Sequence, residues 1–322
     1  MLPVVDASIS VDRIEEAAGL IDPVFLNSPQ FDCAPLSDRL GVETILKVET
    51  VNPIRSFKGR GADYLLHRLT ADKDQRGIVC ASAGNFGQGM AYACRSRGRK
   101  VTVFAARNAN ALKVERMRTL GAHIELTGDD FDEAKDAAKE HARKNDDLYI
   151  EDGRIGAIAE GAGTMARELT ARHDALDAVF VPLGNGSLVN GIGTWLKRHW
   201  PQTKVIAVCA RDSPSMAISF EKGEPTVAPS TSIADGIAVR VPIPEAVAAM
   251  QHTVDEVLLV PDDEMLEWMR HLHTDAGLVI EPAGAAGIAA IAKGRGHHKF
   301  ARVGAILTGG NLTQKQMEEW LY

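Results

Sequence analysis

One lysine stands where an amine could do chemistry. Lys58 lies between a phenylalanine and a glycine in the stretch NPIRSFKGRGADYL, residues 52–65, and a helical pattern follows it directly. A neutral lysine amine can form a Schiff base with an aldehyde, or it can accept a proton. A charged ammonium is mildly disfavoured in the first turn of a helix, because the helix dipole is positive there. Lys58 is therefore a candidate nucleophile and a candidate base.

Glycines and small polar residues mark further junctions between predicted strands and helices. They occur in ASAGNFGQG from Ala81, in VPLGNGSLVNG from Val181 and in ILTGGNLT from Ile306. Bare backbone amides at the start of a helix bind carboxylates and phosphates, and open α/β sheets bind ligands beyond the carboxyl ends of their strands. We expect the loop at Gly184 to hold a phosphate and the loop at Ser82 to hold a second anion.

The elements that position these loops alternate along the chain. Short apolar runs rich in β-branched residues predict strands that begin at Thr44, Gly77, Lys100, Ala122, Ala178, Lys204 and Val303. Apolar residues at spacings of three and four predict helices over residues 110–122, 131–144, 160–173 and 262–277. This alternation is typical of an α/β protein with a mainly parallel sheet.

Composition excludes several other classes of protein. The chain has 322 residues, of which 45% are apolar and 25% charged, and its net charge is -7. The negative charge argues against a nucleic-acid partner. The N-terminus has early acids and no long apolar run, so we expect a soluble cytoplasmic protein without a membrane partner. Cys33, Cys80, Cys94 and Cys209 form no CxxC pair, which favours reduced thiols, and we expect no metal.

Known motifs narrow the kind of phosphate ligand. GNGSLVNG does not match GxGxxG, because Val189 stands where the third glycine is needed, and the chain contains no GxxxxGK loop, HExxH or GxSxG motif. A phosphate loop, a second anion loop and one lysine remain. Those are the parts of a pyridoxal phosphate site, where a lysine holds the aldehyde and a helix N-terminus holds the phosphate.

An ordered set of motifs resembles the fold-type II pyridoxal phosphate enzymes, and most closely the threonine/serine dehydratase and serine racemase branch. The resemblance runs from about Val24 to Asn311 and rests on SFK at 56–58, SAGNFGQG at 82–89, KVERMRTLGA at 113–122, PLGNGSLVNGI at 182–192, IADGIAV at 233–239, EPAGAAG at 281–287 and LTGGN at 307–311. It implies an α/β fold of two doubly wound open-sheet lobes, like tryptophan synthase β, with pyridoxal 5'-phosphate in the cleft between them. Residues 1–76 and 151–322 would form the large cofactor-binding domain, and residues 77–150 the small one.

The resemblance also implies roles for individual residues. Lys58 would hold the cofactor as a Schiff base and act as the catalytic base, and Phe57 would pack against the pyridine ring. Cofactor contacts would further come from Asn85, Gly184, Asn185, Gly186, Ser187, Leu188, Gly236 and Thr308, with Ser187 adding a hydroxyl to the backbone donors of the phosphate loop. Substrate contacts would come from Ser82, Ala83, Asn85 and Phe86.

Thr308 bears on the reaction type, because the resemblance places it beside the pyridine nitrogen. A hydroxyl does not keep that nitrogen protonated, so the ring is a weaker electron sink and favours expulsion of a β-substituent. We therefore expect β-elimination of a β-hydroxy amino acid such as threonine, serine or phenylserine to a 2-oxo acid and ammonia. Three alternatives remain: a β-replacement synthase of the cysteine or threonine synthase kind, an amino acid racemase, and a non-catalytic pyridoxal phosphate-binding module.

Departures from the family pattern refine this expectation. Ala83 replaces the second serine of serine racemases, which disfavours racemisation, and Cys209 and Ser215 stand where the family's divalent-cation site has carboxylates. Phe86 makes the pocket more apolar and Arg55 brings a guanidinium near its edge, which leaves aromatic or acidic substrate side chains open.

Expectations about partners and the ends of the chain complete the interpretation. Glu281 either orients the site or stabilises a helix N-terminus. Relatives suggest a homodimer, and the chain ends eleven residues after Asn311, so we expect no carboxy-terminal regulatory domain.

Overall fold

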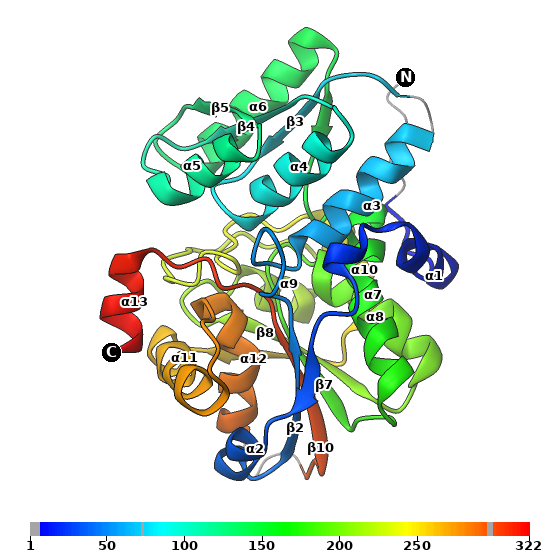
Figure 1. The fold of residues 1–322 in the computed structure, drawn as a ribbon, viewed down its shortest axis with the longest axis vertical. Coiled ribbons are helices and arrows are strands. Elements are labelled where there is room, and N and C mark those ends of the chain that lie inside the picture. Colours follow the sequence, from blue (N-terminus) through cyan, green and yellow to red (C-terminus); the bar gives the residue numbers. More distant parts are fainter. Residues whose placement is uncertain (1–6, 72–73, 295–298) are drawn as a thin grey trace.

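Two open sheets lie in two lobes of the computed structural model, which describes residues 7–71, 74–294 and 299–322 (Figure 1). Residues 1–6, on which part of the expectation about the N-terminus rests, lie outside the described residues. Among the residues that are described, no helix has the length and apolar character that a membrane span requires.

The larger sheet has six strands in the order β1-β2-β10-β7-β8-β9. Their bounds are Gln30–Asp32 for β1, Glu43–Val48 for β2, Arg302–Leu307 for β10, Ala178–Pro182 for β7, Lys204–Ala210 for β8 and Glu256–Val260 for β9. Strand β1 is antiparallel to β2, and every other neighbouring pair is parallel. Continuous apolar strands such as AVFVP bury both faces, as parallel sheets covered by helices on both sides require.

Successive side chains of these strands point to opposite faces of the sheet and pack into two separate hydrophobic cores. Phe180, Ile206 and Val208 face one core with α2 (Ala34–Leu40), α11 (Asp262–Ala276) and α12 (Pro282–Lys293). Val179 and Val205 face the other, with α7 (Gly156–Arg172), α8 (Ser187–His199) and α10 (Pro244–Thr253). Four further helices in the described part of the chain belong neither to the main packing helices of these two cores nor to the small lobe's set given below. They are α1 (Val11–Leu20), the short 3-10 helix η1 (Pro23–Phe25), α9 (Ser215–Lys222) and α13 (Gln314–Leu321).

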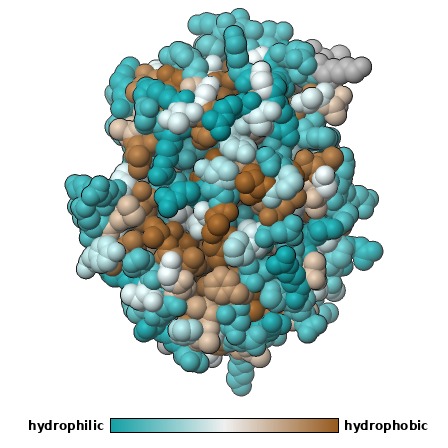
Figure 2. Space-filling view, viewed as in Figure 1, coloured by the Kyte–Doolittle hydropathy of each residue, from teal (hydrophilic) through white to brown (hydrophobic). Residues whose placement is uncertain are grey.

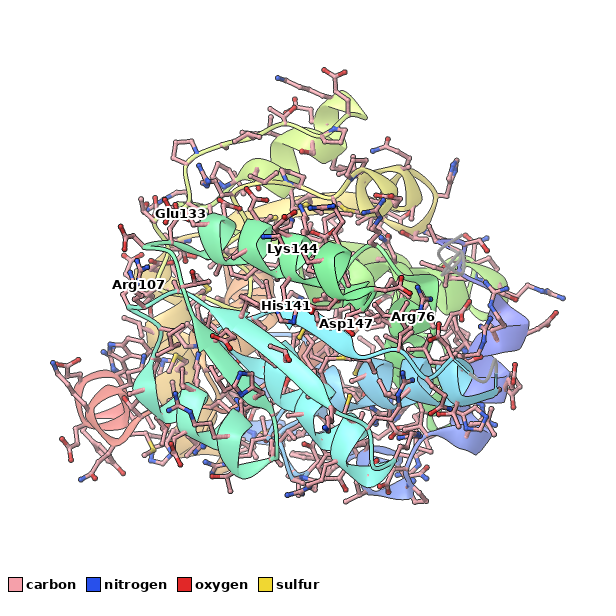
Figure 3. All side chains as sticks on the ribbon, turned by 90° about the horizontal axis from the view of Figure 1, so that it is seen from above. Arg76, Arg107, Glu133, His141, Lys144 and Asp147 are labelled. Carbon is pink, nitrogen blue, oxygen red and sulfur yellow. The ribbon has the colours of Figure 1, made fainter. Side chains whose placement is uncertain are left out.

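The smaller sheet has four parallel strands in the order β5-β4-β3-β6. They are β5 (His123–Leu126), β4 (Val101–Ala105), β3 (Ile78–Ala81) and β6 (Leu148–Ile150). Helix α6 (Phe131–Asn145) covers one face, and the view from above shows Glu133 near its start and Lys144 near its end (Figure 3). Helices α3 (Lys58–Ala71), α4 (Asn85–Ser96) and α5 (Ala111–Thr119) cover the other face.

The α/β class with two open sheets, each covered by helices on both faces, is confirmed. All seven predicted strands are present, but β1, β6 and β9 were not predicted, because β1 and β6 have only three residues and β9 is half exposed. Helix α4 begins at Asn85, within the SAGNFGQG motif. The domain boundaries at residues 77 and 150 stay a prediction; Leu65 and Leu66 of α3, outside that range, pack into the core of the small sheet.

Candidate active site

A cavity of about 580 Å³ lies where the two lobes meet. Most of the face shown in Figure 2 is hydrophilic, and its hydrophobic side chains gather mainly in the middle of the molecule. The residues that the resemblance singled out all line this cavity, namely Phe57, Lys58, Ser82, Ala83, Asn85, Phe86, Gly184, Asn185, Gly186, Ser187, Leu188, Gly236 and Thr308. Arg55 does not line it, and its side chain is exposed. The expectation of a guanidinium near the edge of the pocket stays a prediction.

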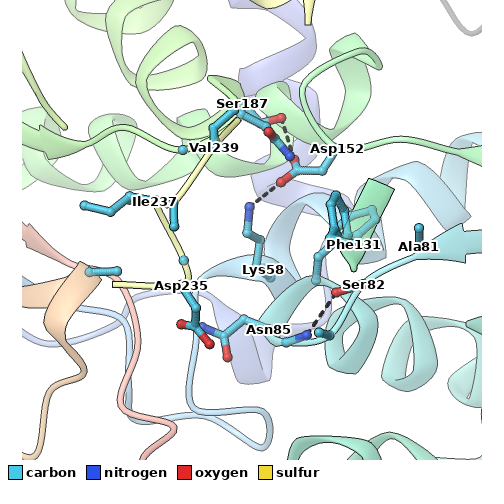
Figure 4. A pocket seen from close by; sticks show the side chains of 18 of the residues that line it. Lys58, Ala81, Ser82, Asn85, Phe131, Asp152, Ser187, Asp235, Ile237 and Val239 are labelled. Carbon is cyan, nitrogen blue, oxygen red and sulfur yellow. Dashed lines mark hydrogen bonds and ion pairs between the residues drawn. The ribbon is translucent and has the colours of Figure 1, made fainter. Parts of the chain in front are cut away.

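Lys58 is the first residue of α3, and its side chain points into the cavity (Figure 4). The backbone N–H of Phe57 donates to the Thr308 carbonyl at 3.1 Å, which ties the start of α3 to the end of β10. The Lys58 Nζ lies 2.5 Å from Oδ2 of Asp152 and 4.6 Å from the centroid of the Phe57 ring. The amine is thus held by one carboxylate and by an aromatic face.

The loop after β7 forms a cradle with an open helix end. Gly186 has φ +93°, a left-handed conformation that favours glycine, and α8 begins at the next residue. A Cβ on Gly184 would lie 2.7 Å from the Gly236 carbonyl oxygen, so only glycine allows the two loops to approach this closely. The first N–H groups of α8 have no carbonyl partner within the helix and face an anion site.

Ser187 does not use its hydroxyl as the sequence suggested. The hydroxyl accepts a hydrogen bond from the Gly153 N–H at 2.8 Å and donates one to Oδ1 of Asp152 at 2.7 Å. Its proton is therefore directed to a carboxylate, and only the backbone N–H of Ser187 remains for a phosphate.

The loop after β3 also uses its serine to build itself. The Ser82 Oγ accepts from the N–H of Gly84 at 3.2 Å and from the N–H of Gly87 at 2.9 Å. A hydroxyl has two acceptor positions and one proton, so the proton of Ser82 is left to donate. This leaves one O–H donor, at the start of α4, for a carboxylate in the cavity.

Asn85 is fixed by Glu281 and Asn311, neither of which was predicted to contact it. Its Nδ2 donates to Oε1 of Glu281 at 2.7 Å, and its Oδ1 accepts from Nδ2 of Asn311 at 2.8 Å. The N–H of Asn311 donates to the second oxygen of Glu281 at 3.2 Å. Of the two roles considered for Glu281, the structure supports orientation of the site.

Glu281 sits in an environment that opposes its charge. Burial, and to a lesser degree the charge of Asp235, raises the pKa of its carboxyl, while Lys113 and the hydrogen bonds from Asn311 and Asn85 lower it, and the net result is a pKa of about 7. Lys113 and Asp235 form an ion pair between α5 and the loop of residues 233–239. The protonation of Glu281 therefore depends on a charge pair that joins the two lobes.

A pH-dependent stability follows from this raised pKa. A carboxyl whose pKa is raised from 4.5 to about 7 on folding stabilises the fold below about pH 4.5, and this contribution is lost as the pH rises to about 7. In the wild type, titration of Glu281 should lower the free energy of unfolding by up to about 3 kcal/mol between pH 5 and pH 8. We expect Glu281→Gln to abolish this decrease. Urea unfolding of both proteins at the two pH values measures this difference. An equal fall in both proteins would contradict it.

Asp152 and the acidic start of α6 are site residues that sequence reasoning missed. Asp152 lies two residues after the end of β6, and Asp130, Phe131 and Asp132 also line the cavity. Asp132 forms an ion pair with Arg240 of the other lobe. Recognition of the three-residue strand β6 would have placed Asp152 at the carboxyl edge of a sheet, where ligands bind. Among the described residues, no three His, Cys, Asp or Glu side chains are grouped to hold a metal.

The chain is similar to known proteins over most of its length. Residues 21–309 match the family described as pyridoxal-phosphate dependent enzyme. The biosynthetic L-threonine dehydratase of Lactococcus lactis is 33% identical over 319 residues, which are 97% of this chain and 77% of that protein. The biosynthetic L-threonine dehydratase of Haemophilus influenzae is 35% identical over 93% of this chain, which spans only 58% of that longer protein. The structure of maize serine racemase superposes with a TM-score of 0.90 at 25% identity, covering 97% of this chain and 96% of that one.

Proposed function

The chain belongs to the family of pyridoxal-phosphate-dependent enzymes. We propose that it is an ammonia-lyase that acts by β-elimination on a β-hydroxy amino acid such as threonine, serine or phenylserine. The products are a 2-oxo acid and ammonia. One observation carries the assignment of the site: the Lys58 amine and the glycine loop that begins at Gly184 border the same cavity. Threonine has the support of the dehydratases to which the chain is similar.

The residues present fit the cofactor. The loop of Gly184 to Leu188 and the open end of α8 would hold its phosphate, Phe57 and Gly236 would contact its ring, and Asn85 and Thr308 would bond to ring atoms. When bound, pyridoxal phosphate supplies an aldehyde that condenses with amines and a ring that withdraws electrons from the α-carbon of the substrate.

The chain's own residues would bind the substrate and move its proton. The O–H of Ser82 and the N–H groups at the start of α4 donate to the substrate carboxylate, and Ala83 and Phe86 border the same place. The Lys58 amine removes the α-proton as general base. The β-hydroxyl leaves with a proton as water, and the Lys58 ammonium formed in the preceding step can supply that proton. The ion pairs Lys113–Asp235 and Asp132–Arg240 join the lobes around the cavity and limit the access of solvent.

A racemase is the second candidate because maize serine racemase has the same fold at 25% identity. It would remove the same α-proton, but it needs an acid on the opposite face of the substrate. Ala83 has no such group. This difference favours elimination.

A substrate panel tests the function directly. Release of a 2-oxo acid and ammonia from stereoisomers of serine, threonine, phenylserine and hydroxyaspartate is expected for at least one β-hydroxy amino acid. A new amino acid formed on addition of a thiol would indicate a β-replacement synthase. Inversion of the α-carbon without ammonia release would indicate a racemase, and either result would reject the lyase.

We also propose the domain division at residues 77 and 150, a cytoplasmic location and a homodimer. The homodimer is the assembly that the family resemblance suggests. Sedimentation equilibrium measures the oligomeric state, and a monomer over the whole concentration range would reject the dimer.

A further inference from the structure

Asp152 contacts the reacting nitrogen of the proposed site, yet the proposed reaction has not used it. Its Oδ2 lies 2.5 Å from the Lys58 Nζ, and its Oδ1 accepts from the Ser187 hydroxyl at 2.7 Å. The Asp152 side chain is only 7% exposed and that of Lys58 15%. One carboxylate therefore connects the lysine amine to the loop that would hold the phosphate, as the dashed lines of Figure 4 show.

The turn that carries Asp152 is packed tightly against that loop. Gly153 has φ +94°, and a Cβ on it would lie 2.3 Å from the Asn185 carbonyl oxygen. The Gly153 N–H also donates to the Ser187 hydroxyl. Rotation of the Asp152 carboxylate away from Lys58 would also break its hydrogen bond from the Ser187 hydroxyl. The carboxylate is thus a fixed part of the site rather than a mobile surface acid.

We propose that Asp152 is a catalytic residue, the counter-ion that stabilises the Lys58 amine as that amine takes up the substrate proton; this inference rests on the proposed function. When Lys58 acts as a base, the C–H bond of the substrate breaks, an N–H bond forms, and the electron pair stays on the substrate carbon. The nitrogen changes from neutral to positive, while Asp152 remains an anion. A fixed negative charge at hydrogen-bonding distance in a buried site stabilises the charge that develops on the nitrogen.

The same carboxylate opposes capture of the cofactor. The Lys58 nitrogen must leave its contact with the Asp152 carboxylate to attack an aldehyde, so this contact competes with the attack. The carboxylate also lies beside the loop for the phosphate, whose negative charge it repels. Asp152 therefore has opposite effects on two rates: it speeds removal of the substrate proton and slows capture of the cofactor.

A purely structural ion pair would behave differently. If Asp152 only kept Lys58 and the Gly184 loop in place, its loss would disorder both, and cofactor capture and proton removal would slow together. Opposite changes in the two rates separate the proposal from that role.

The Asp152→Asn protein tests the proposal, since asparagine keeps the shape and removes the charge. Cofactor-free protein is mixed with pyridoxal phosphate, and the visible absorbance of the lysine-bound cofactor gives the rate of capture. We expect capture to be about 3- to 10-fold faster than in the wild type. The variant has no carboxylate to repel the phosphate of the cofactor, and its contact with the Lys58 amine is weaker. In the loaded protein, exchange of the substrate α-hydrogen with deuterated water is expected to slow about 10- to 100-fold, with KM changed less than about threefold.

Two further variants serve as controls. Glu151→Gln makes the same chemical change at the neighbouring residue, whose carboxylate pairs with Lys135, and it should leave both rates at wild-type values. Asp152→Glu keeps the charge, so its capture rate should stay close to that of the wild type. Slower capture together with slower exchange in Asp152→Asn, or unchanged exchange in that protein, would overturn the proposal.

The capture and exchange measurements also separate this inference from the proposed function. Capture needs no substrate, and α-hydrogen exchange reports the base whether or not a β-substituent leaves. A wild-type protein that exchanges the α-hydrogen but releases no 2-oxo acid would reject the lyase while the role of Asp152 is still measured.

Discussion

Lys58→Ala is expected to abolish turnover and the visible absorbance that the bound cofactor gains from its link to the lysine. The amine has two roles in the proposed site, because it anchors the aldehyde and removes the α-proton. General-base catalysis alone contributes about 10²- to 10⁴-fold, so 2-oxo acid release should fall by at least about 10³-fold. Absorbance spectra of the purified protein with pyridoxal phosphate, and assays with the best substrate of the panel, measure the two losses.

Two other lysines line the same cavity and provide a matched comparison. Lys135 pairs with Glu151, and Lys113 pairs with Asp235. Lys135→Ala should keep the absorbance and most of the turnover, because its amine pairs with Glu151 and not with Asp152, the partner of Lys58. If the absorbance were lost with Lys113→Ala and kept with Lys58→Ala, the assignment of the anchoring amine would be wrong.

Local sequence was sufficient to predict where the principal site residues lie. Lys58 and Asn85 each begin a helix, while Thr308 and Gly184 lie one and two residues after the end of a strand, and short patterns determine such junctions. In parallel sheets the carboxyl ends of the strands meet at one edge, so prediction of the junctions also predicts that their side chains gather. The structure brings all four to one cavity; their individual chemical roles stay predictions.

Contacts between distant side chains could not be predicted in the same way. Asp152 is 94 residues from Lys58, and an Asp-Gly pair after a short strand is a common turn sequence without a chemical signal. The Ser187 hydroxyl was expected to serve a phosphate, but the position of Asp152 decides its direction. Arg55 was expected near the edge of the pocket because of its place before SFK; its side chain is exposed and does not line the cavity.

A cluster of buried charges supports the helix that carries Lys58. Arg60 of α3 donates to Glu49 at 2.9 Å and to Glu168 at 2.6 Å, and Lys47 contacts Glu168 as well. These side chains are between 0% and 6% exposed. Burial lowers the pKa of Arg60, but the charges of Glu49 and Glu168 outweigh it and the pKa is raised, so this arginine stays charged. The cluster thus holds two cations and two anions without solvent.

Removal of one cation from this cluster should have the largest effect on stability among the substitutions considered. Arg60→Met leaves Glu49 and Glu168 with Lys47 as their only cation in the cluster. An uncompensated buried charge costs about 3–5 kcal/mol, so the free energy of unfolding should fall by that amount. Urea unfolding of the cofactor-free protein, followed by circular dichroism, measures the loss.

A second substitution tests whether the loss of stability in Arg60→Met comes from unbalanced charge or from lost packing. Arg60→Met combined with Glu49→Leu restores one cation and one anion, and buried pairs replaced by apolar side chains of similar volume are often neutral in stability. The double variant should therefore be more stable than Arg60→Met alone, which is a non-additive result for neighbouring residues. Arg167→Met, which removes an exposed pair with Glu15, should cost no more than about 1 kcal/mol. A double variant that loses more stability than Arg60→Met would show that packing around α3 and not the buried charge sets the cost.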